Sequence, residues 1–255
     1  MRVLRKARHP NIAMFCGACI DTTTSDLCLV YELVQGTVLE IYVSRPPMSP
    51  DTVARHRVAM GIASALQYLH AQRPIIIHGD LKPSNVIVEH QKFGPRAKLI
   101  DFGLSRLQTR HAKRLGGTRC WKAPEVSSKS GKPEPSADVY SFGLLLYFIV
   151  TGSKSGETLS RNEMLRLTPE QHYSKLFTWM DGMDLLEEAR SLCFECSLVD
   201  ATLRPEMATV QSKLSKWLQS SDGDGKNAMP QIIGLTEQVC RLREQCLPRR
   251  GESTE

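Results

Sequence analysis

Three short polar motifs with fixed separations constrain the structure of this chain more than any other feature of its sequence. HGDLKPSN ends at Asn85, DFG begins at Asp101 and APE ends at Glu125, so the separations are 16 and 24 residues. Brief apolar runs alternate with polar clusters over residues 75–101. That alternation is typical of polar loops carried on short strands. The motifs therefore predict a site built from loops on a rigid scaffold.

The remaining pattern indicates a mixed α+β fold. Two β-like runs cover residues 13–20 and 27–34, and a helix is predicted from Pro50, at its first position, to Leu69. The most apolar run extends from Val139 to Val150. It is well short of the roughly 20 residues that a membrane span needs, so it predicts a buried helix.

The net charge does not indicate an unusual partner. The formal charge of +6 comes from 33 Lys and Arg residues against 27 Asp and Glu residues. This excess is too mild to predict a nucleic acid partner, because no basic stripe accompanies it. The basic N-terminus is not followed by a long apolar stretch, so neither a secretory signal nor a transit peptide is predicted. Cytosol or nucleus is therefore the default location, and we expect a cytoplasmic protein without a membrane span.

Eight cysteines include two CxxC pairs, Cys16 with Cys19 and Cys193 with Cys196. Together the two pairs could supply four thiolates to a zinc ion. Each pair lies among apolar residues, where free cysteine behaves as a small core hydrophobe. The sequence favours buried free thiols in a reduced intracellular protein.

The C-terminal region has two parts with different patterns. The SSDGDGK stretch at residues 220–226 is rich in turn residues and predicts a linker. Beyond it, apolar residues recur at alternating spacings of three and four, which predicts one apolar stripe on a helix. The stripe consists of Ile232, Leu235, Val239, Leu242 and Cys246. Such a helix would dock on the chain's own domain or bind a partner through residues 231–247.

The three motifs, taken in this order, resemble the protein kinase family. The resemblance implies an α+β kinase-like fold with a mostly helical C-terminal lobe. It places a remnant of the N-terminal lobe and the hinge at residues 1–34 and the C-terminal lobe at 35–218. A linker at 219–230 and an amphipathic helix with a tail at 231–255 would follow.

The resemblance also implies ATP and Mg²⁺ as cofactors and a protein Ser or Thr hydroxyl as the phosphate acceptor. Asp80 matches the catalytic aspartate that orients this hydroxyl and accepts its proton. Lys82 matches the lysine that contacts the transferred phosphate, and Thr118 matches the threonine that bonds both side chains. Asn85 and Asp101 match the magnesium ligands. The residues at positions 82 and 118 favour the serine/threonine class.

The DLCLVYEL segment resembles the strand and hinge that hold adenine. Tyr31 would guard the back pocket, Glu32 and Val34 would offer backbone groups, and Ile87 would form the adenine floor. Tyr31 together with HGDLKPSN resembles the tyrosine-kinase-like branch, which includes interleukin-receptor-associated and plant receptor-like kinases. A buried aromatic residue on a strand is the alternative interpretation of Tyr31.

Other positions match structural residues of the family or depart from its pattern. Glu125 and Arg204 match a buried ion pair, and Asp138 matches the aspartate that braces the catalytic loop. Gly79 stands where many members carry an arginine that binds an activation-loop phosphate. Trp121 stands where tyrosine is more common.

The family's Gly-rich loop and strand lysine are expected upstream of Met1, so the resemblance predicts that this chain lacks most of the N-terminal lobe. Two hypotheses follow. The first is a protein serine/threonine kinase whose activity is impaired by the missing loop and lysine. The second is a catalytically inactive kinase-fold scaffold or binding module.

Overall fold

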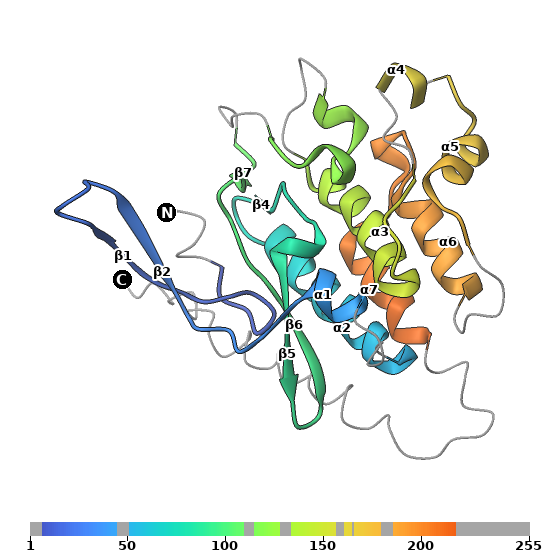
Figure 1. Cartoon of the computed structure of the whole chain (residues 1–255). Coiled ribbons are helices and arrows are strands. Elements are labelled where there is room, and N and C mark those ends of the chain that lie inside the picture. The colour runs from blue at the N-terminus through green and yellow to red at the C-terminus, as the bar shows by residue number, and fades with distance from the viewer. Residues whose placement is uncertain are drawn as a thin grey trace, which may run out of the picture. The chain divides into compact units, whose positions relative to one another are not determined.

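The computed structural model describes residues 7–44, 51–109, 115–127, 134–156, 161–164, 166–179 and 186–217 (Figure 1). The predicted linker at 219–230 and the predicted helix with its tail at 231–255 lie outside the described residues. Helices combined with small antiparallel sheets confirm the predicted α+β class.

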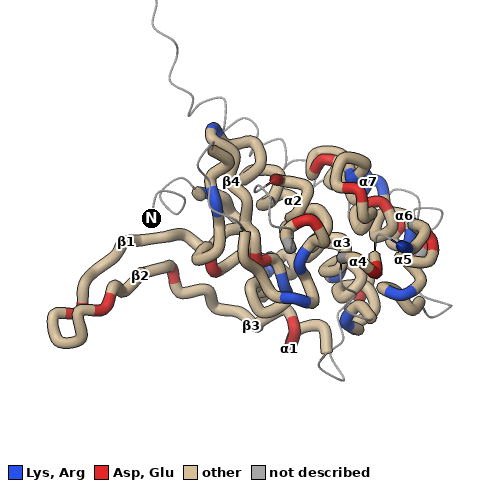
Figure 2. Tube along the Cα trace, turned by 90° about the horizontal axis from the view of Figure 1, so that it is seen from above, with Lys and Arg blue, Asp and Glu red and all other residues tan. Residues whose placement is uncertain are grey.

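A β-hairpin forms the first part of the described chain. β1 (Phe15–Ile20) and β2 (Leu27–Tyr31) pair antiparallel, close to the two predicted β-like runs. The hairpin extends away from the helical part of the molecule, and acidic residues mark its far end (Figures 1 and 2). These are Asp21 and Asp26, whose backbone groups bond across the turn at 2.9 Å. Most of the hairpin's apolar side chains are exposed, with Ile20 at 67%.

Two further small sheets hold the polar motifs. β3 (Gly36–Val38), β5 (Val86–Gln91) and β6 (Gly94–Leu99) form an antiparallel sheet in the order β3-β5-β6. β4 (Ile76–Ile77) pairs with β7 (Arg106–Leu107). The HGDLKPSN motif lies between β4 and β5, and the DFG motif lies between β6 and β7. Both motifs are therefore carried at strand ends, which confirms that part of the prediction.

Helices make up most of the remaining described chain. The long helix α2 (Thr52–His70) begins two residues after Pro50, the predicted first position, which lies outside the described residues. The side chain of Asp51 caps the helix by accepting the Ala54 N–H at 2.7 Å. The other helices are α1 (Leu39–Ser44), α3 (Pro135–Thr151), α4 (Arg161–Met164), α5 (Pro169–Leu176), α6 (Leu186–Cys196) and α7 (Met207–Lys216). Short 3₁₀ helices lie between the other elements at η1 (Pro83–Asn85), η2 (Arg119–Trp121), η3 (Pro124–Ser127) and η4 (Ala201–Leu203).

The core is built around α3. Every residue from Ala137 to Val150 is buried, as the apolar run predicts. α3 packs against α2 and α6, while α2 also packs against β6 and α7. Within the ranges that the structure describes, none of the helices has the length and apolar content needed to cross a bilayer.

The predicted pair of Glu125 and Arg204 is confirmed as an ion pair between distant segments, with a buried guanidinium and a partly exposed carboxylate. The guanidinium donates to both carboxylate oxygens, at 2.7 and 2.9 Å. The Arg204 side chain has no exposed surface and lies 4.9 Å from the ring centroid of Tyr140. It also donates to the backbone carbonyls of Ser136, Leu198 and Val199. One side chain therefore joins η3, the start of α3 and the segment before η4.

Replacing Arg204 with Ala should lower the free energy of unfolding by roughly 3 to 5 kcal/mol, because it strands a partly buried carboxylate. Glu125→Ala should also destabilise, and the double variant should lose less than the two single losses summed. Chemical denaturation of the four proteins measures this. Strict additivity would show that the two side chains do not interact. Glu187→Ala, which removes an exposed pair at 3.2 Å to Arg190, serves as the control and should change stability by less than about 1 kcal/mol.

His172 on α5 lies close to this ion pair and is only 2% exposed. Burial, and secondarily the positive charge of Arg204, lowers its pKa from 6.5 to about 4. The folded state therefore holds His172 neutral. The pKa of His172 is lower in the folded state than in the unfolded state, so the folded state binds fewer protons in this pH range. The contribution of His172 to the free energy of unfolding is therefore complete above pH 6.5 and is lost as the pH falls.

The free energy of unfolding should fall as the pH is lowered from 6.5 to 4. His172 should account for about 3 kcal/mol of that fall, by order of magnitude. His172→Gln should make the pH dependence less steep, because glutamine does not titrate. His9, His56 and His78, whose pKa values burial also lowers, would still contribute in the variant. Denaturation curves of both proteins across this window provide the test. An equally steep pH dependence in the variant would mean that His172 is not one of the titrating groups.

Candidate active site

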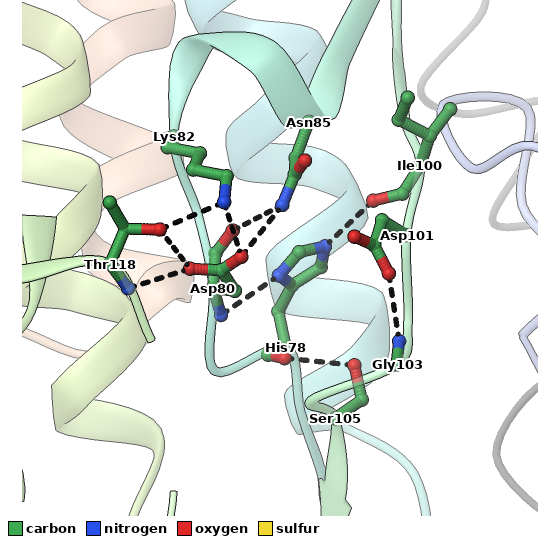
Figure 3. Close-up of polar contacts among 9 residues, drawn as sticks. All are labelled: His78, Asp80, Lys82, Asn85, Ile100, Asp101, Gly103, Ser105 and Thr118. Carbon is green, nitrogen blue, oxygen red and sulfur yellow. Dashed lines mark hydrogen bonds and ion pairs between the residues drawn. The ribbon is translucent and has the colours of Figure 1, made fainter. Parts of the chain in front are cut away.

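The carboxylate of Asp80 is the centre of a compact polar network (Figure 3). Its Oδ1 accepts bonds from the backbone N–H and the hydroxyl of Thr118, both at 2.9 Å. Its Oδ2 lies 2.7 Å from Lys82 Nζ and accepts a bond from Asn85 Nδ2 at 3.1 Å. Burial acts to raise the pKa of Asp80, but the bonds from Lys82 and Thr118 hold it below the usual value. Asp80 is therefore ionised at neutral pH.

Lys82 and Thr118 complete a triangle with Asp80. Lys82 Nζ donates to Thr118 Oγ1 at 2.8 Å, so each of the three side chains contacts the other two. Thr118 lies immediately before η2, and 36 residues separate it from Lys82. The contacts that the sequence predicts for Thr118 are thus present, while the catalytic roles of the three residues remain predictions.

Asn85 and Asp101 present oxygen atoms of the kinds that Mg²⁺ prefers. The buried Asn85 donates its amide to the Asp80 carbonyl at 2.8 Å, and its amide oxygen points away from Asp80 (Figure 3). Asp101 is exposed, has a φ of 61°, and accepts the Gly103 N–H at 3.0 Å. A positive φ at a non-glycine residue is strained and concentrates at functional sites. Within the described ranges, Asp101 forms no hydrogen bond with Asp80 or Asn85.

His78 links the two motifs. Its ring lies 5.1 Å from the ring of Phe102 and contacts the Ile100 carbonyl at 3.3 Å. The His78 carbonyl accepts a bond from the hydroxyl of Ser105 at 2.8 Å. The DFG segment is thereby fixed on the loop that carries Asp80.

A buried carboxylate on α3 holds that loop in place. Asp138 is 1% exposed and accepts the N–H groups of His78 and Gly79 at 2.8 and 2.9 Å. It also contacts His70 Nε2, at the end of α2, at 2.9 Å. Burial favours a raised pKa, but the hydrogen bond and charge of His70 keep the pKa of Asp138 below its usual value. The predicted bracing by Asp138 is confirmed, whereas His70 was not predicted because nothing in its local sequence marks it.

Gly79 occupies a position that a larger residue would not tolerate. Its φ is +78°, and a Cβ atom there would lie 2.8 Å from Leu115 Cδ2 and 3.2 Å from the Leu104 carbonyl oxygen. An arginine at this position would displace the end of the Leu115 side chain and would strain the backbone, because the φ is positive. The local backbone conformation therefore favours glycine over the arginine that many family members carry.

The predicted adenine residues lie on the hairpin, the segment after it and β5. Tyr31 is half-buried, with its ring 5.7 Å from Phe15, and its pKa is raised by burial and then by the charge of Asp101. Val34 and Ile87 are also half-buried. Tyr31 is therefore near the DFG aspartate.

Glu32 has an additional role that the sequence did not reveal. Its carboxylate pairs with Lys98 of β6 at 2.5 Å and accepts the Met14 N–H at 2.8 Å. Its own N–H donates to the Met14 carbonyl at 2.9 Å. The Lys98 side chain is 9% exposed, so this pair ties the hairpin to the β5–β6 sheet.

The prediction for the cysteines is partly wrong. Cys193 and Cys196 are buried, and burial raises the pKa of both thiols. Cys16 and Cys19 are exposed, because the hairpin that carries them has little packed against it. Among the described residues, no group of three or more His, Cys, Asp or Glu side chains is arranged to hold a metal ion.

Comparison with known proteins connects this geometry to a family. The model of the protein kinase domain matches residues 1–218. A probable serine/threonine-protein kinase, SIS8, of Arabidopsis thaliana is 31% identical over 220 residues, covering 85% of this chain and 20% of the relative. The probable serine/threonine-protein kinase pats1 of Dictyostelium discoideum is 31% identical over 84% of this chain and 6% of the relative.

A receptor kinase is also similar. The L-type lectin-domain containing receptor kinase VI.2 of Arabidopsis thaliana is 40% identical over 160 residues, which cover 59% of this chain and 23% of the relative. The chain thus spans a quarter or less of the lengths of these three relatives. The family match covers most of the chain and includes every residue of the Asp80 network, so the chain belongs to the protein kinase family.

Proposed function

We propose that this chain is the catalytic part of a serine/threonine protein kinase that transfers the γ-phosphate of ATP to Ser or Thr hydroxyls of a protein. The observation that carries the proposal is the closed triangle of Asp80, Lys82 and Thr118, with separations of 2.7 to 2.9 Å. Phosphoryl transfer depends mainly on positioning and on electrostatic stabilisation, and this network supplies both. When bound, Mg-ATP would supply the phosphoryl group and the metal charge.

Asp80 would orient the acceptor hydroxyl and take its proton. Its carboxylate is ionised, and four donors fix its orientation. A base held in this way points at one position instead of sampling several, which is what proton transfer requires. Lys82 would place positive charge where negative charge develops on the phosphoryl oxygens.

The residues implied for the metal and the nucleotide fit those ligands chemically. Asn85 and Asp101 offer an amide oxygen and a carboxylate, which are hard donors for Mg²⁺. Tyr31, Glu32, Val34 and Ile87 would form the adenine site. The Glu32 N–H is used within the hairpin, so its carbonyl is the backbone group that Glu32 would offer to adenine.

The finer classification follows from the same residues and the relatives. Lys82 and Thr118 support the Ser/Thr class, as do the names of the relatives. The receptor kinase relative supports a place in the tyrosine-kinase-like branch. We also propose a cytoplasmic location and the domain limits 1–34, 35–218, 219–230 and 231–255.

A kinase-fold scaffold is the second candidate. It is favoured by the predicted apolar stripe at residues 231–247, which offers a surface for a partner protein. The C-terminal stripe at residues 231–247 would then serve as the partner-binding helix. An intact Asp80 network favours the enzyme, because a scaffold has no need for it.

Asp80→Ala should lower turnover by about 10² to 10⁴-fold, because it removes the proton acceptor. The affinity for Mg-ATP should stay nearly unchanged, since Asp80 acts on the acceptor hydroxyl. Phosphate transfer and nucleotide titration, in a protein with a related kinase's N-terminal lobe fused upstream, measure both quantities. An equal loss of ATP affinity would contradict this role. Asp200→Ala, at an exposed aspartate, is the control and should change neither quantity.

Asp101→Ala in the same fused protein should weaken magnesium-dependent nucleotide binding as well as turnover. The physical reason is that a metal held by Asp101 would bridge the protein and the phosphates. Nucleotide affinity measured over a magnesium titration tests the assignment. If the variant keeps the magnesium dependence of the parent, Asp101 is not a metal ligand.

Residues 1–255 alone should bind ATP poorly and turn over far below the fused protein. Without the strand lysine and the Gly-rich loop, the phosphates lose a fixed positive charge and a cover that excludes water. Turnover on a generic protein substrate, with and without the fused lobe, provides the measurement. A rate of roughly 1 to 100 per second for the unfused chain would contradict this expectation. Failure of the fused protein to transfer phosphate would favour the scaffold.

A further inference from the structure

We propose that Cys19 and Cys28 form a site of reversible oxidation, a dithiol that closes to a disulfide across the β1–β2 hairpin on reaction with a small disulfide such as oxidised glutathione. This site lies outside the Asp80 network and does not depend on the proposed function.

The pairing register of the hairpin places the two cysteines face to face. Cys19 and Cys28 are direct partners in the antiparallel ladder, between the pairs Ala18 with Leu29 and Ile20 with Leu27. Directly opposed residues have Cα atoms roughly 4.5 to 5.5 Å apart and side chains on the same side of the ladder. A disulfide spans Cα separations of about 4.4 to 6.8 Å. The cross-link therefore fits the hairpin with its strands in place.

Both thiols are accessible to an oxidant. Cys19 and Cys28 are exposed, on a hairpin that extends away from the helices (Figures 1 and 2). Cys193 and Cys196 provide the contrast, because they have no exposed surface and burial raises the pKa of both thiols. Burial keeps those thiols protonated and out of contact with an oxidant, so the hairpin pair should react before them.

Cys16 lies on the same strand but is not placed to compete. The register shifts between Phe15 and Gly17, which leaves Cys16 at an irregularity without an opposed residue. Its thiol contacts the Met14 carbonyl oxygen at 3.8 Å. Cys16 is therefore a matched control, since it is an exposed thiol on the same strand and differs from Cys19 in register.

The reaction is ordinary thiol–disulfide exchange. The thiolate of one cysteine attacks oxidised glutathione, which forms a mixed disulfide and releases one glutathione thiolate. The thiolate of the opposed cysteine then attacks the protein sulfur of that mixed disulfide, forms the Cys19–Cys28 bond and releases the second glutathione. Glutathione disulfide gains two electrons, and the two protons lost by the cysteines end on the two released glutathione thiols. Excess reduced glutathione drives the steps backward, so the modification is reversible.

The test uses the whole chain, equilibrated with oxidised glutathione, alkylated and digested by a protease that cleaves before aspartate. Cleavage at Asp21 and Asp26 separates the fragment with Cys16 and Cys19 from the fragment with Cys28. Mass spectrometry before and after reduction then detects fragments joined by a disulfide. Wild type, Cys16→Ser, Cys19→Ser and Cys28→Ser are compared, and each substitution places a hydroxyl at an exposed position.

The expected result is a joined pair of fragments in wild type and Cys16→Ser and its complete loss in Cys19→Ser and Cys28→Ser. Those two variants should instead retain glutathione on the remaining thiol. The bond should form within monomers and disappear when reduced glutathione is added. Three results would overturn the proposal. These are joined fragments in Cys19→Ser at the level of Cys16→Ser, joined fragments only in dimers, or independent glutathione adducts on Cys19 and Cys28 in wild type.

Discussion

The buried carboxylate of Asp138 is the interaction on which the geometry of the site depends. An ionised group that is 1% exposed would be costly without partners, and Asp138 has them in the two loop N–H groups and His70. Because a single carboxylate takes both N–H groups, the loop conformation at His78 and Gly79 is fixed to the most buried helix. Asp80 follows Gly79 in the chain, so Asp138 of α3 fixes the backbone next to it. Lys82 and Thr118 then orient the Asp80 carboxylate itself.

A second ion pair, between the buried Arg204 and the partly buried Glu125, anchors the segment that carries Thr118. Arg204 holds Glu125 in η3, and Glu125 lies seven residues after Thr118. The two anchors meet on α3, since Asp138 lies on it and Arg204 bonds the carbonyl of Ser136 in its first turn. A rigid helix, buried on all sides, thus positions both chain segments that meet at Asp80. This arrangement explains how a site made of loops achieves separations of 2.7 to 2.9 Å.

The hairpin contrasts with this core. Its strands pair only with each other within the described chain, and Ile20, Leu27 and Val30 are 47% to 67% exposed. Its link to the β5–β6 sheet includes the pair of Glu32 and Lys98. The hairpin, which carries Tyr31 of the proposed adenine site, therefore has mostly exposed side chains in the described chain, whereas the proposed chemical centre rests on the buried helix α3.

The sequence by itself determined the elements that follow from a local pattern of residues. The apolar run from Val139 to Val150 required a buried helix, and the motif spacing required loops at strand ends. Only the tertiary structure decided which residues pair across distant segments. Glu32 pairs with Lys98 over 66 residues, and His70 pairs with Asp138 over 68 residues. Contacts over such separations produce no periodic pattern in the sequence. It also decided burial, since Cys16 and Cys193 have similar apolar neighbours in sequence but opposite exposure. Local composition indicates whether a residue favours a buried or an exposed environment, but only the packing of the whole chain determines which environment it has.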